Sequence, residues 1–339
     1  MTASDGVELS VIIATHDRRE LLRRCLESLS AQTQDPATFE VIVADDGSGD
    51  GSAEMAEAFE APFRLRVLGL EQGGQAHAQN AAVEQAEGAI CLLLDDDMIA
   101  SPELVAAHID AHSAEPLTLG VGAITQRPPA ARDWYAHAFA RSWNAHYEEF
   151  AERSPGWIDC YGANLSFPLA KLREIDGVTT DIAATFDLEL GARLSAAGCI
   201  PTFLPRAHGV HDDQKRRGKM LKNAERQGET HVELARRRPG MAPELLDWRG
   251  RAGQWEVSLR RLLLALRVPP TLLAKLGPMV PGNERELLWY SIVRRFAFWR
   301  GVRRSISRDE WALLTRTPEE IHEYSTVIGL SVVVAEAIL

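Results

Sequence analysis

The stretch Cys91-Leu92-Leu93-Leu94-Asp95-Asp96-Asp97-Met98 joins an apolar run directly to three consecutive aspartates. A short continuous apolar run of this kind is typical of a strand that is buried on both faces of a parallel sheet. The carboxylates would then emerge at the carboxyl edge of the sheet, where open α/β folds bind ligands. Three neighbouring acids favour a divalent cation, because hard cations prefer carboxylate oxygens.

Two of these three aspartates are expected to face the same way. Side chains alternate along an extended chain, so Asp95 and Asp97 would point to one side and Asp96 to the other. We therefore predict Asp95 and Asp97 as the metal pair. The alternative is an acidic turn that caps the following helix, near Ser101-Pro102-Glu103.

The rest of the first half alternates between apolar, β-branched runs and helical patterns. Strands are predicted over residues 9–14, 39–44 and 65–70, with further strands over 119–126 and 200–205. Between the first two strands, a helix places Leu22, Cys25, Leu26 and Leu29 on one face, and an Ala-rich helix is expected over 75–87. Such alternation predicts βαβ units and a mostly parallel sheet.

Length and charge narrow the class of protein. The chain has 339 residues, enough for one large domain or two smaller ones, and its 45% hydrophobic and 25% charged content is ordinary for a globular protein. A net charge of -11 argues against a nucleic-acid partner.

Cysteine usage and the chain ends favour a cytoplasmic protein. The four cysteines lie far apart, and Cys25 and Cys91 fall in apolar patterns typical of buried thiols. The first residues show neither the basic nor the apolar region of a signal peptide. The longest apolar tract near the end, residues 327–339, is too short for a spanning helix.

The turn after the first strand reads Thr15-His16-Asp17-Arg18. It lacks the G-x-G-x-x-G sequence of a dinucleotide-binding Rossmann domain, and the chain has no P-loop pattern. The alternative that aspartates and a metal bind a nucleotide without a Gly-rich loop remains open.

Four short motifs occur in a fixed order. They are V-I-I-A-T-H-D-R at 11–18, E-V-I-V-A-D-D-G-S at 40–48, G-G-Q-A-H-A-Q-N at 73–80 and L-L-L-D-D-D-M at 92–98. Together they resemble family 2 glycosyltransferases of the GT-A fold, over roughly residues 9–240. The resemblance implies a Rossmann-like α/β fold, with a mostly parallel sheet flanked by helices and a helical C-terminal extension. We expect a catalytic domain at 1–215, divided at about residue 120 into nucleotide-binding (1–120) and acceptor (121–215) halves, and a helical region at 216–339.

The resemblance also implies roles for individual residues. Thr15 and Asp17 would line the nucleotide pocket, and Asp46 would hydrogen-bond the base, typically uracil. Asp95 and Asp97 would bind Mn2+ or Mg2+ bridged to the donor diphosphate, where the metal offsets the charge of the leaving group. The further nucleotide-binding positions are Arg18, Gly74, Asn80 and Asp96. Family members often carry Arg at the position of Gln79, so that cation would either be missing or come from Arg18 or a downstream Lys or Arg.

The segment F-D-L-E-L-G-A-R-L at 186–194 resembles the family's E-D-x-[DE]-L-x-x-R-L helix start. Asp187 would be the general base that an acceptor hydroxyl needs, and the helix dipole would favour its charged form. Phe186 departs from the pattern, which has an acid there. The alternatives are that Asp187 only caps the helix, or that Glu189 is the base. We expect Arg193 to pair with Glu189.

Two further candidates come from the second half of the catalytic domain. Family members often place a histidine after the last strand as a third metal ligand, and His211 fits better than His208. An aromatic stripe at helical spacing is predicted to be core, with Trp143 the best candidate for a sugar platform. The stripe comprises Trp134, Tyr135, Phe139, Trp143 and Tyr147.

The C-terminal third is predicted to form helices over residues 220–234, 255–266 and 286–304. The last of these carries an apolar stripe, Trp289, Ile292, Val293, Phe296 and Trp299, with arginines around it. We expect this stripe to pack against the protein. The alternative is peripheral contact of the basic C-terminal helices with the inner face of a membrane, which would suit a lipid-linked acceptor.

The predicted function is metal-dependent transfer of a sugar from a nucleotide sugar, a UDP-sugar by resemblance, to an acceptor hydroxyl with inversion. The acceptor class (glycan, lipid-linked or small molecule) stays open. One alternative is a nucleotidyltransferase, although such enzymes normally carry a Gly-rich basic loop after the first strand. Another is a non-catalytic nucleotide-sugar-binding protein, for which Phe186 would signal a decayed site.

Overall fold

The computed structural model describes residues 6–127, 133–182, 184–212, 217–247, 254–277 and 283–315. The chain divides into two compact units, one formed by residues 1–128 and 140–214 and the other by 129–139 and 215–339. The division falls within helix α5 (Trp134–Glu148). Each unit is described separately below.

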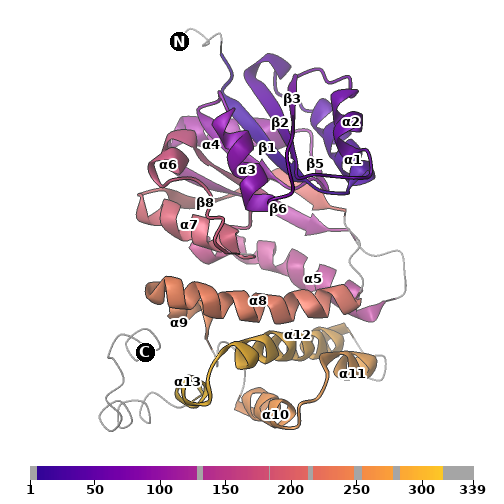
Figure 1. Ribbon diagram of the computed structural model, residues 1–339, viewed down its shortest axis with the longest axis vertical. Coiled ribbons are helices and arrows are strands. Elements are labelled where there is room, and N and C mark those ends of the chain that lie inside the picture. The colour runs from indigo at the N-terminus through magenta and orange to yellow at the C-terminus, as the bar shows by residue number, and fades with distance from the viewer. Residues whose placement is uncertain are drawn as a thin grey trace. The chain divides into compact units, whose positions relative to one another are not determined.

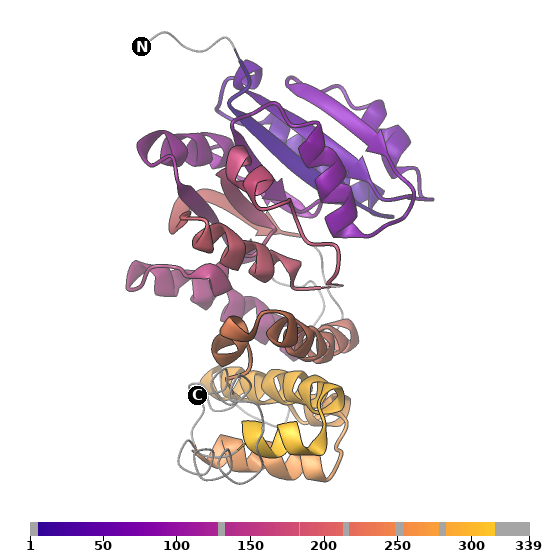
Figure 2. The same ribbon diagram turned by 60° about the vertical axis from the view of Figure 1, so that its left-hand side comes forward.

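The first unit is built on an eight-stranded mixed sheet (Figures 1 and 2). Its spatial order is β3 (Arg64–Gly69), β2 (Phe39–Asp45), β1 (Leu9–Thr15), β4 (Ile90–Leu94), β7 (Asn164–Pro168), β6 (Thr118–Gln126), β8 (Ile200–His211) and β5 (Met98–Ala100). The β3–β2–β1–β4 half is parallel, as is the β6–β8 pair. Strand β7 is antiparallel to both of its neighbours, and β5 is antiparallel to β8. The predicted α/β class is confirmed.

Helices flank this sheet. They are α1 (Arg19–Ser30), α2 (Ser52–Glu57), α3 (Gln75–Glu84), α4 (Leu104–Ala114), α6 (Leu169–Glu174) and α7 (Phe186–Ala196), with 3-10 turns at Pro36–Thr38, Glu149–Ala151 and Trp157–Asp159. Helix α1 buries all four of its predicted core residues. The thiols of Cys25 and Cys91 are fully buried, as expected.

The three aspartates lie in a tight turn between β4 and β5, not on the end of a strand. The prediction of an extended chain there was wrong, because β5 leaves β4 and pairs at the far edge of the sheet order. A three-residue link spans at most about 14 Å. Five neighbouring strands in a flat sheet would place the outer two about 19 Å apart. The sheet must therefore curl, which brings β5 and β8 to the turn after β4.

Strand β8 is longer than the sequence indicated. It was predicted over 200–205 and extends to His211, with a register irregularity opposite Gly122 and Ala123 that accommodates Pro205. The histidines assigned to a following loop therefore lie in the strand. Residues after Pro205 are held by pairing with β6 on one side and β5 on the other, and such non-local pairing leaves no local pattern.

The second unit is helical. Its elements are α8 (Arg217–Arg237), a 3-10 turn at Pro239–Met241, α9 (Ala242–Leu245), α10 (Gln254–Ala265), α11 (Pro270–Lys275), α12 (Asn283–Ser305) and α13 (Arg308–Leu314). Four of the five stripe residues of α12 are buried, with Val293 and Phe296 almost inaccessible, and Trp289 is half-buried. In the ranges described, no helix combines the length and apolarity needed to cross a membrane.

The aromatic stripe of α5 is shared between the cores of the two units. Tyr135 is buried with residues of the second unit, and Tyr147 with residues of the first. Trp143 is half-buried, and its ring centroid lies 5.1 Å from that of Tyr161. Tyr135 and Tyr147 are core residues, as predicted, whereas Trp134, Phe139 and Trp143 are only half-buried.

Helices α8 and α12 pack with their backbones in contact, and we expect this packing to control the stability of the second unit. A Cβ on Gly301 would overlap the carbonyl oxygen of Glu225, so Gly301→Ala should destabilise the unit by roughly 1–3 kcal/mol. Gly218 on α8 has open space, so Gly218→Ala should instead add up to about 1 kcal/mol. Thermal unfolding of both variants checks this. A Tm for Gly301→Ala at or above that of Gly218→Ala would contradict the prediction.

Candidate active site at the turn after strand β4

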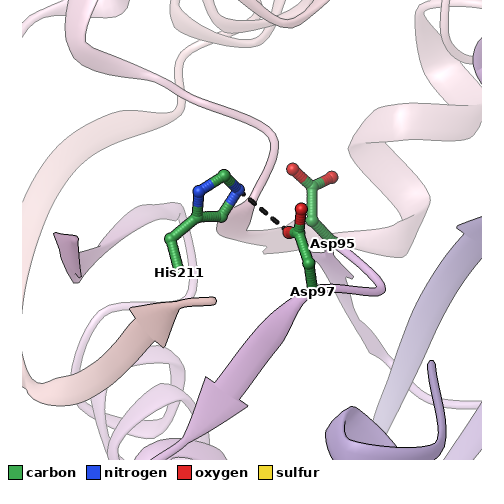
Figure 3. Close-up of side chains that lie close together, drawn as sticks. All are labelled: Asp95, Asp97 and His211. Atoms are coloured by element: carbon green, nitrogen blue, oxygen red, sulfur yellow. Dashed lines mark ion pairs between the residues drawn. The ribbon is translucent and has the colours of Figure 1, made fainter. Parts of the chain in front are cut away.

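Asp95, Asp97 and His211 converge at the turn after β4 (Figure 3). One potential ligand atom from each residue lies within 4.8 Å of the other two. The pairing of β5 with β8 places Met98 opposite His211, and this register brings the imidazole to the neighbouring Asp97. The structure thus brings together the three predicted metal ligands.

The imidazole of His211 is buried and held from both sides. Its Nε2 lies 2.9 Å from Oδ1 of Asp97, and its Nδ1 lies 3.2 Å from Nε2 of Gln126. His208, the alternative ligand, has its Nε2 2.9 Å from the Thr125 hydroxyl. Burial lowers the pKa of His208, so it is neutral at pH 7.

Asp96 has surroundings different from those of the metal pair. Its carboxylate accepts hydrogen bonds from the Thr15 hydroxyl at 2.7 Å and from the Arg18 guanidinium at 2.6 Å. Burial raises the pKa of Asp96, and Arg18 opposes this shift. The same Arg18 nitrogen lies 2.8 Å from Oδ2 of Asp97. Thr15, Arg18 and Asp96, all predicted to contact the nucleotide, therefore lie beside the metal pair.

The side chains around the turn fit a divalent cation. Two carboxylates and an imidazole form a donor set that suits Mn2+, and carboxylates alone suit Mg2+. Ligands on opposite sides of an ion bound at about 2.1 Å are about 4.2 Å apart. The observed spread of at most 4.8 Å needs only a small side-chain adjustment to reach that geometry. Arg18 balances part of the acidic charge through its ion pairs with Asp96 and Asp97.

The loops after β1 and β2 are tied together. Asp17 has a positive φ of 51° and accepts a hydrogen bond from the Gly49 amide at 2.7 Å, while its own amide donates to Ser48 Oγ. Asp46 is buried and accepts hydrogen bonds from the amides of Gly73 and Gly74, at 2.7 and 2.9 Å. These contacts pre-organise the edge at which the resemblance places the base and ribose.

The side chain of Asn80 is hydrogen-bonded to the loop that follows α6. Its amide exchanges two hydrogen bonds with the backbone of Val178, at 2.7 and 2.8 Å. A Cβ on Gly177, which has a φ of 76°, would lie 2.8 Å from Asn80 Oδ1. In this arrangement Asn80 positions the loop after α6 rather than pointing to Asp96 or Arg18.

Asp187 begins helix α7 and is half-buried. Its carboxylate accepts hydrogen bonds from the backbone amides of Gly162 at 3.3 Å and Leu188 at 3.0 Å. Burial raises the pKa of Asp187, and these two amides oppose the shift. A carboxylate with a raised pKa that retains acceptor capacity suits proton abstraction. Phe186 packs against the core of the first unit.

Glu189, the reserve candidate for the base, is buried in an ion pair. Both of its oxygens lie 2.8 Å from Nε of Arg193, as the helical spacing predicted. Arg193 also donates to the carbonyl oxygens of Ile175 and Gly177. Glu189 therefore holds the arginine that ties α7 to the loop after α6, and its carboxylate is already engaged by that arginine.

Sequence reasoning missed several supporting side chains. Gln75 donates to Asp95 Oδ1 at 3.2 Å, and Gln126 contacts His211. Asp212 is buried between Arg24 and Arg127, and its amide donates to the Asp97 carbonyl at 2.9 Å. Gln75 opens the third motif and could have been suspected, whereas nothing local marks Gln126 or Asp212.

A curled mixed sheet with an acid pair at the turn after its central strand defines the GT-A class of α/β proteins. Residues 10–175 match the model for "Glycosyl transferase family 2", and this region of the chain belongs to that family. The predicted family is thereby confirmed.

Individual relatives agree with this assignment. An uncharacterized glycosyltransferase, YfnE, of Bacillus subtilis is 37% identical over 147 residues, which cover 43% of this chain and 36% of the relative. A validoxylamine A glucosyltransferase of Streptomyces hygroscopicus subsp. limoneus is 26% identical over 270 residues, covering 70% of this chain and 58% of the relative. The matches thus span from about a third to three fifths of these relatives.

One solved structure supports the fold. A mannosyltransferase of Pyrobaculum calidifontis, in complex with GDP-Man and Mn2+, superimposes with a TM-score of 0.53 and covers 98% of this chain and 85% of that one. At 19% sequence identity, this likeness supports the GT-A fold alone.

Proposed function

We propose that this protein transfers a sugar from a nucleotide sugar to an acceptor hydroxyl, with a divalent metal and with inversion at the anomeric carbon. The observation that carries the proposal is the convergence of Asp95, Asp97 and His211 at the turn after β4, in a chain of glycosyl transferase family 2. Curated relatives described as glycosyltransferases support the same reaction class.

Asp95, Asp97 and His211 would hold Mn2+ or Mg2+. When bound, the metal neutralises negative charge on the diphosphate leaving group. Arg18 would also neutralise charge on the diphosphate, because its guanidinium already contacts Asp96 and Asp97 and can donate to phosphate oxygens. It would supply the cation that Gln79 does not.

The donor nucleotide would lie along the carboxyl edge of β1 and β2. Thr15 and Asp17 would line its pocket, and Asp46 would bind the base. Gly74, which has no side chain, would let the donor approach the backbone closely. Asn80 would act by holding the adjacent loop through Val178. A UDP-sugar is the donor that the family pattern favours.

Asp187 would act as the general base. As the acceptor oxygen bonds to the anomeric carbon, its proton passes to the Asp187 carboxylate, and the bond from that carbon to the diphosphate oxygen breaks. The electron pair of the broken bond leaves with the nucleoside diphosphate. The amides of Gly162 and Leu188 orient the carboxylate.

Trp143 and Tyr161 provide a candidate platform for a sugar ring beside this base. Their rings are 5.1 Å apart, and Tyr161 immediately precedes Gly162, which donates to Asp187. An aromatic face of this kind can pack on the apolar face of a pyranose.

The test is isothermal titration calorimetry with UDP, GDP, ADP and CMP, each with and without Mn2+. We expect one nucleoside diphosphate to bind at least ten-fold more tightly with Mn2+ present, because a cation held by Asp95, Asp97 and His211 would offset the diphosphate charge. A nucleotide-sugar panel with the preferred base would then be assayed for release of that nucleoside diphosphate.

Two results would count against the proposal. Binding that is indifferent to Mn2+ would remove the metal from the mechanism. Release of pyrophosphate from a nucleoside triphosphate, with no turnover of any nucleotide sugar, would identify a nucleotidyltransferase instead.

A further inference from the structure

The helical second unit contains a cavity of about 610 Å3 lined largely by arginines. It lies among residues of α10, α12 and α13 and the segments that follow them. The arginines are Arg261, Arg267, Arg300, Arg303 and Arg304. Phe296 and Trp311 supply apolar wall.

Among the described residues, the arginines of this cavity outnumber the carboxylates that pair with them. Arg300 and Arg304 share one carboxylate, that of Glu225, each at 2.8 Å. Arg261 donates to the carbonyl oxygen of Thr315, and Arg303 lies 5.5 Å from the ring centroid of Trp311. In the described ranges the cavity lining contains five arginines and no Asp or Glu, and the carboxylate of Glu225 pairs with only two of these arginines.

Helix α10 carries an exposed apolar stripe beside this cavity. Trp255, Leu262 and Leu266 are 54%, 56% and 65% exposed. At 100° per residue they lie within about 40° of one another around the helix axis. Arg261 and Ala265, which line the cavity, each lie about 100° around the helix axis from the stripe residue that follows them, so the stripe borders the cavity-lining face.

Arginine-rich cavities suit phosphate, because the planar guanidinium donates two parallel hydrogen bonds to phosphate oxygens. Exposed Trp and Leu beside basic side chains suit the interface of a bilayer, where the ring and the aliphatic groups enter the acyl boundary. The apolar stripe of α12 packs inside the second unit, as expected, so it does not offer this surface.

We propose that the cavity of the second unit binds the phosphate headgroup of an anionic lipid, with the α10 stripe inserted beside it. The site is separate from the proposed metal centre and does not depend on the transfer reaction. Arg261 and Arg267 are exposed and, unlike the exposed Arg304, are not in the ion pair with Glu225.

The experiment is co-sedimentation of the full chain with vesicles of phosphatidylcholine alone or mixed with phosphatidylglycerol, in EDTA. We expect binding to the mixed vesicles only. Each basic residue near an anionic surface contributes a roughly five-fold change in affinity. Arg261→Gln/Arg267→Gln should therefore weaken binding more than ten-fold.

Two matched controls distinguish binding at this site from non-specific electrostatic and hydrophobic binding to the vesicles. Arg238→Gln/Arg285→Gln removes the same charge from exposed positions of the same unit outside the cavity, and should bind as wild type does. Leu262→Ser/Leu266→Ser should weaken vesicle binding. Leu117→Ser/Ile200→Ser, at exposed apolar positions of the first unit, should not.

A titration without vesicles tests whether the cavity binds a soluble phosphate rather than a lipid headgroup. Inorganic pyrophosphate is titrated into wild type and Arg261→Gln/Arg267→Gln by calorimetry in EDTA, which suppresses metal-dependent binding elsewhere. Arginine-dependent binding of pyrophosphate without any vesicle binding would overturn the lipid assignment in favour of a soluble phosphate. Vesicle binding that survives the arginine substitutions, or is absent in wild type, would also overturn it.

Discussion

Asp97→Asn is expected to reduce glycosyl transfer at least about 100-fold and to abolish the Mn2+ dependence of donor binding. Substitution of residues outside the ligand shell typically costs 10–100-fold in metal affinity, so loss of a ligand charge should cost no less. Asp97 contributes to the site through both oxygens, which lie 2.9 Å from His211 Nε2 and 2.8 Å from Arg18. Asparagine preserves the shape of the side chain but removes its charge.

The fold should tolerate this change. Arg18 keeps its contact with Asp96 at 2.6 Å, and the Asp97 backbone carbonyl still accepts from the Asp212 amide. The measurement is calorimetric titration of the preferred nucleoside diphosphate at several Mn2+ concentrations, with transfer rates on the same samples. Asp95→Asn should show the same loss.

Asp110→Asn is the matched control, since Asp110 is exposed and pairs only with Arg206 among the contacts described. It should leave metal-dependent binding intact. Wild-type Mn2+ dependence in both Asp95→Asn and Asp97→Asn would contradict the metal assignment.

Asp187→Asn should lower kcat by about 10²- to 10⁴-fold while leaving donor binding unchanged. That range is the usual contribution of a positioned general base. Asparagine keeps the hydrogen-bonding geometry toward Gly162 and Leu188 approximately, but it cannot accept a proton at neutral pH. Single-turnover transfer and calorimetric donor binding on the same variant separate the two effects.

The same residue predicts a pH dependence. Burial raises the pKa of Asp187, so the acid limb of the kcat profile should lie above the ordinary aspartate pKa of about 3.9. Activity should fall as pH drops through the raised value. The neighbouring Tyr147 and Cys160 have pKa values raised by burial and stay neutral across this range. The limb should vanish from the residual rate of Asp187→Asn.

Stability should respond in the opposite direction to activity. A folded-state pKa above the unfolded value means that stability falls as pH rises from about 3.9 through the raised pKa, and that the buried charge is a constant cost above it. Asp187→Asn removes this charge, so its Tm at pH 7 should equal or exceed that of wild type.

Glu189→Gln provides the contrast, because it leaves Arg193 without its buried partner and should lower Tm. Full activity of Asp187→Asn would end its assignment as the base. Loss of activity only in parallel with loss of Tm would reduce Asp187 to a helix cap.

Much of the first unit follows from local sequence. Runs such as residues 9–14 and 39–44 are continuous and β-branched, which a strand buried on both faces requires, and they form β1 and β2 with one residue added to each. The i, i+3, i+4, i+7 pattern of α1 likewise specifies its buried face. Because adjacent parallel strands end at one edge, the sequence could predict that the aspartates after β4 lie at that edge of the sheet.

The third potential ligand and its support depended on tertiary structure. His211 reaches Asp97 only because β5 pairs with β8 in a register that sets Met98 against His211, across a curl and a register shift. Arg18 on the acid pair and the burial of the α12 stripe are likewise long-range results. Periodicity within one segment specifies whether it is a helix or a strand and which face it buries. The partner and register of that segment depend on residues distant in the chain, and only the folded structure brings them together.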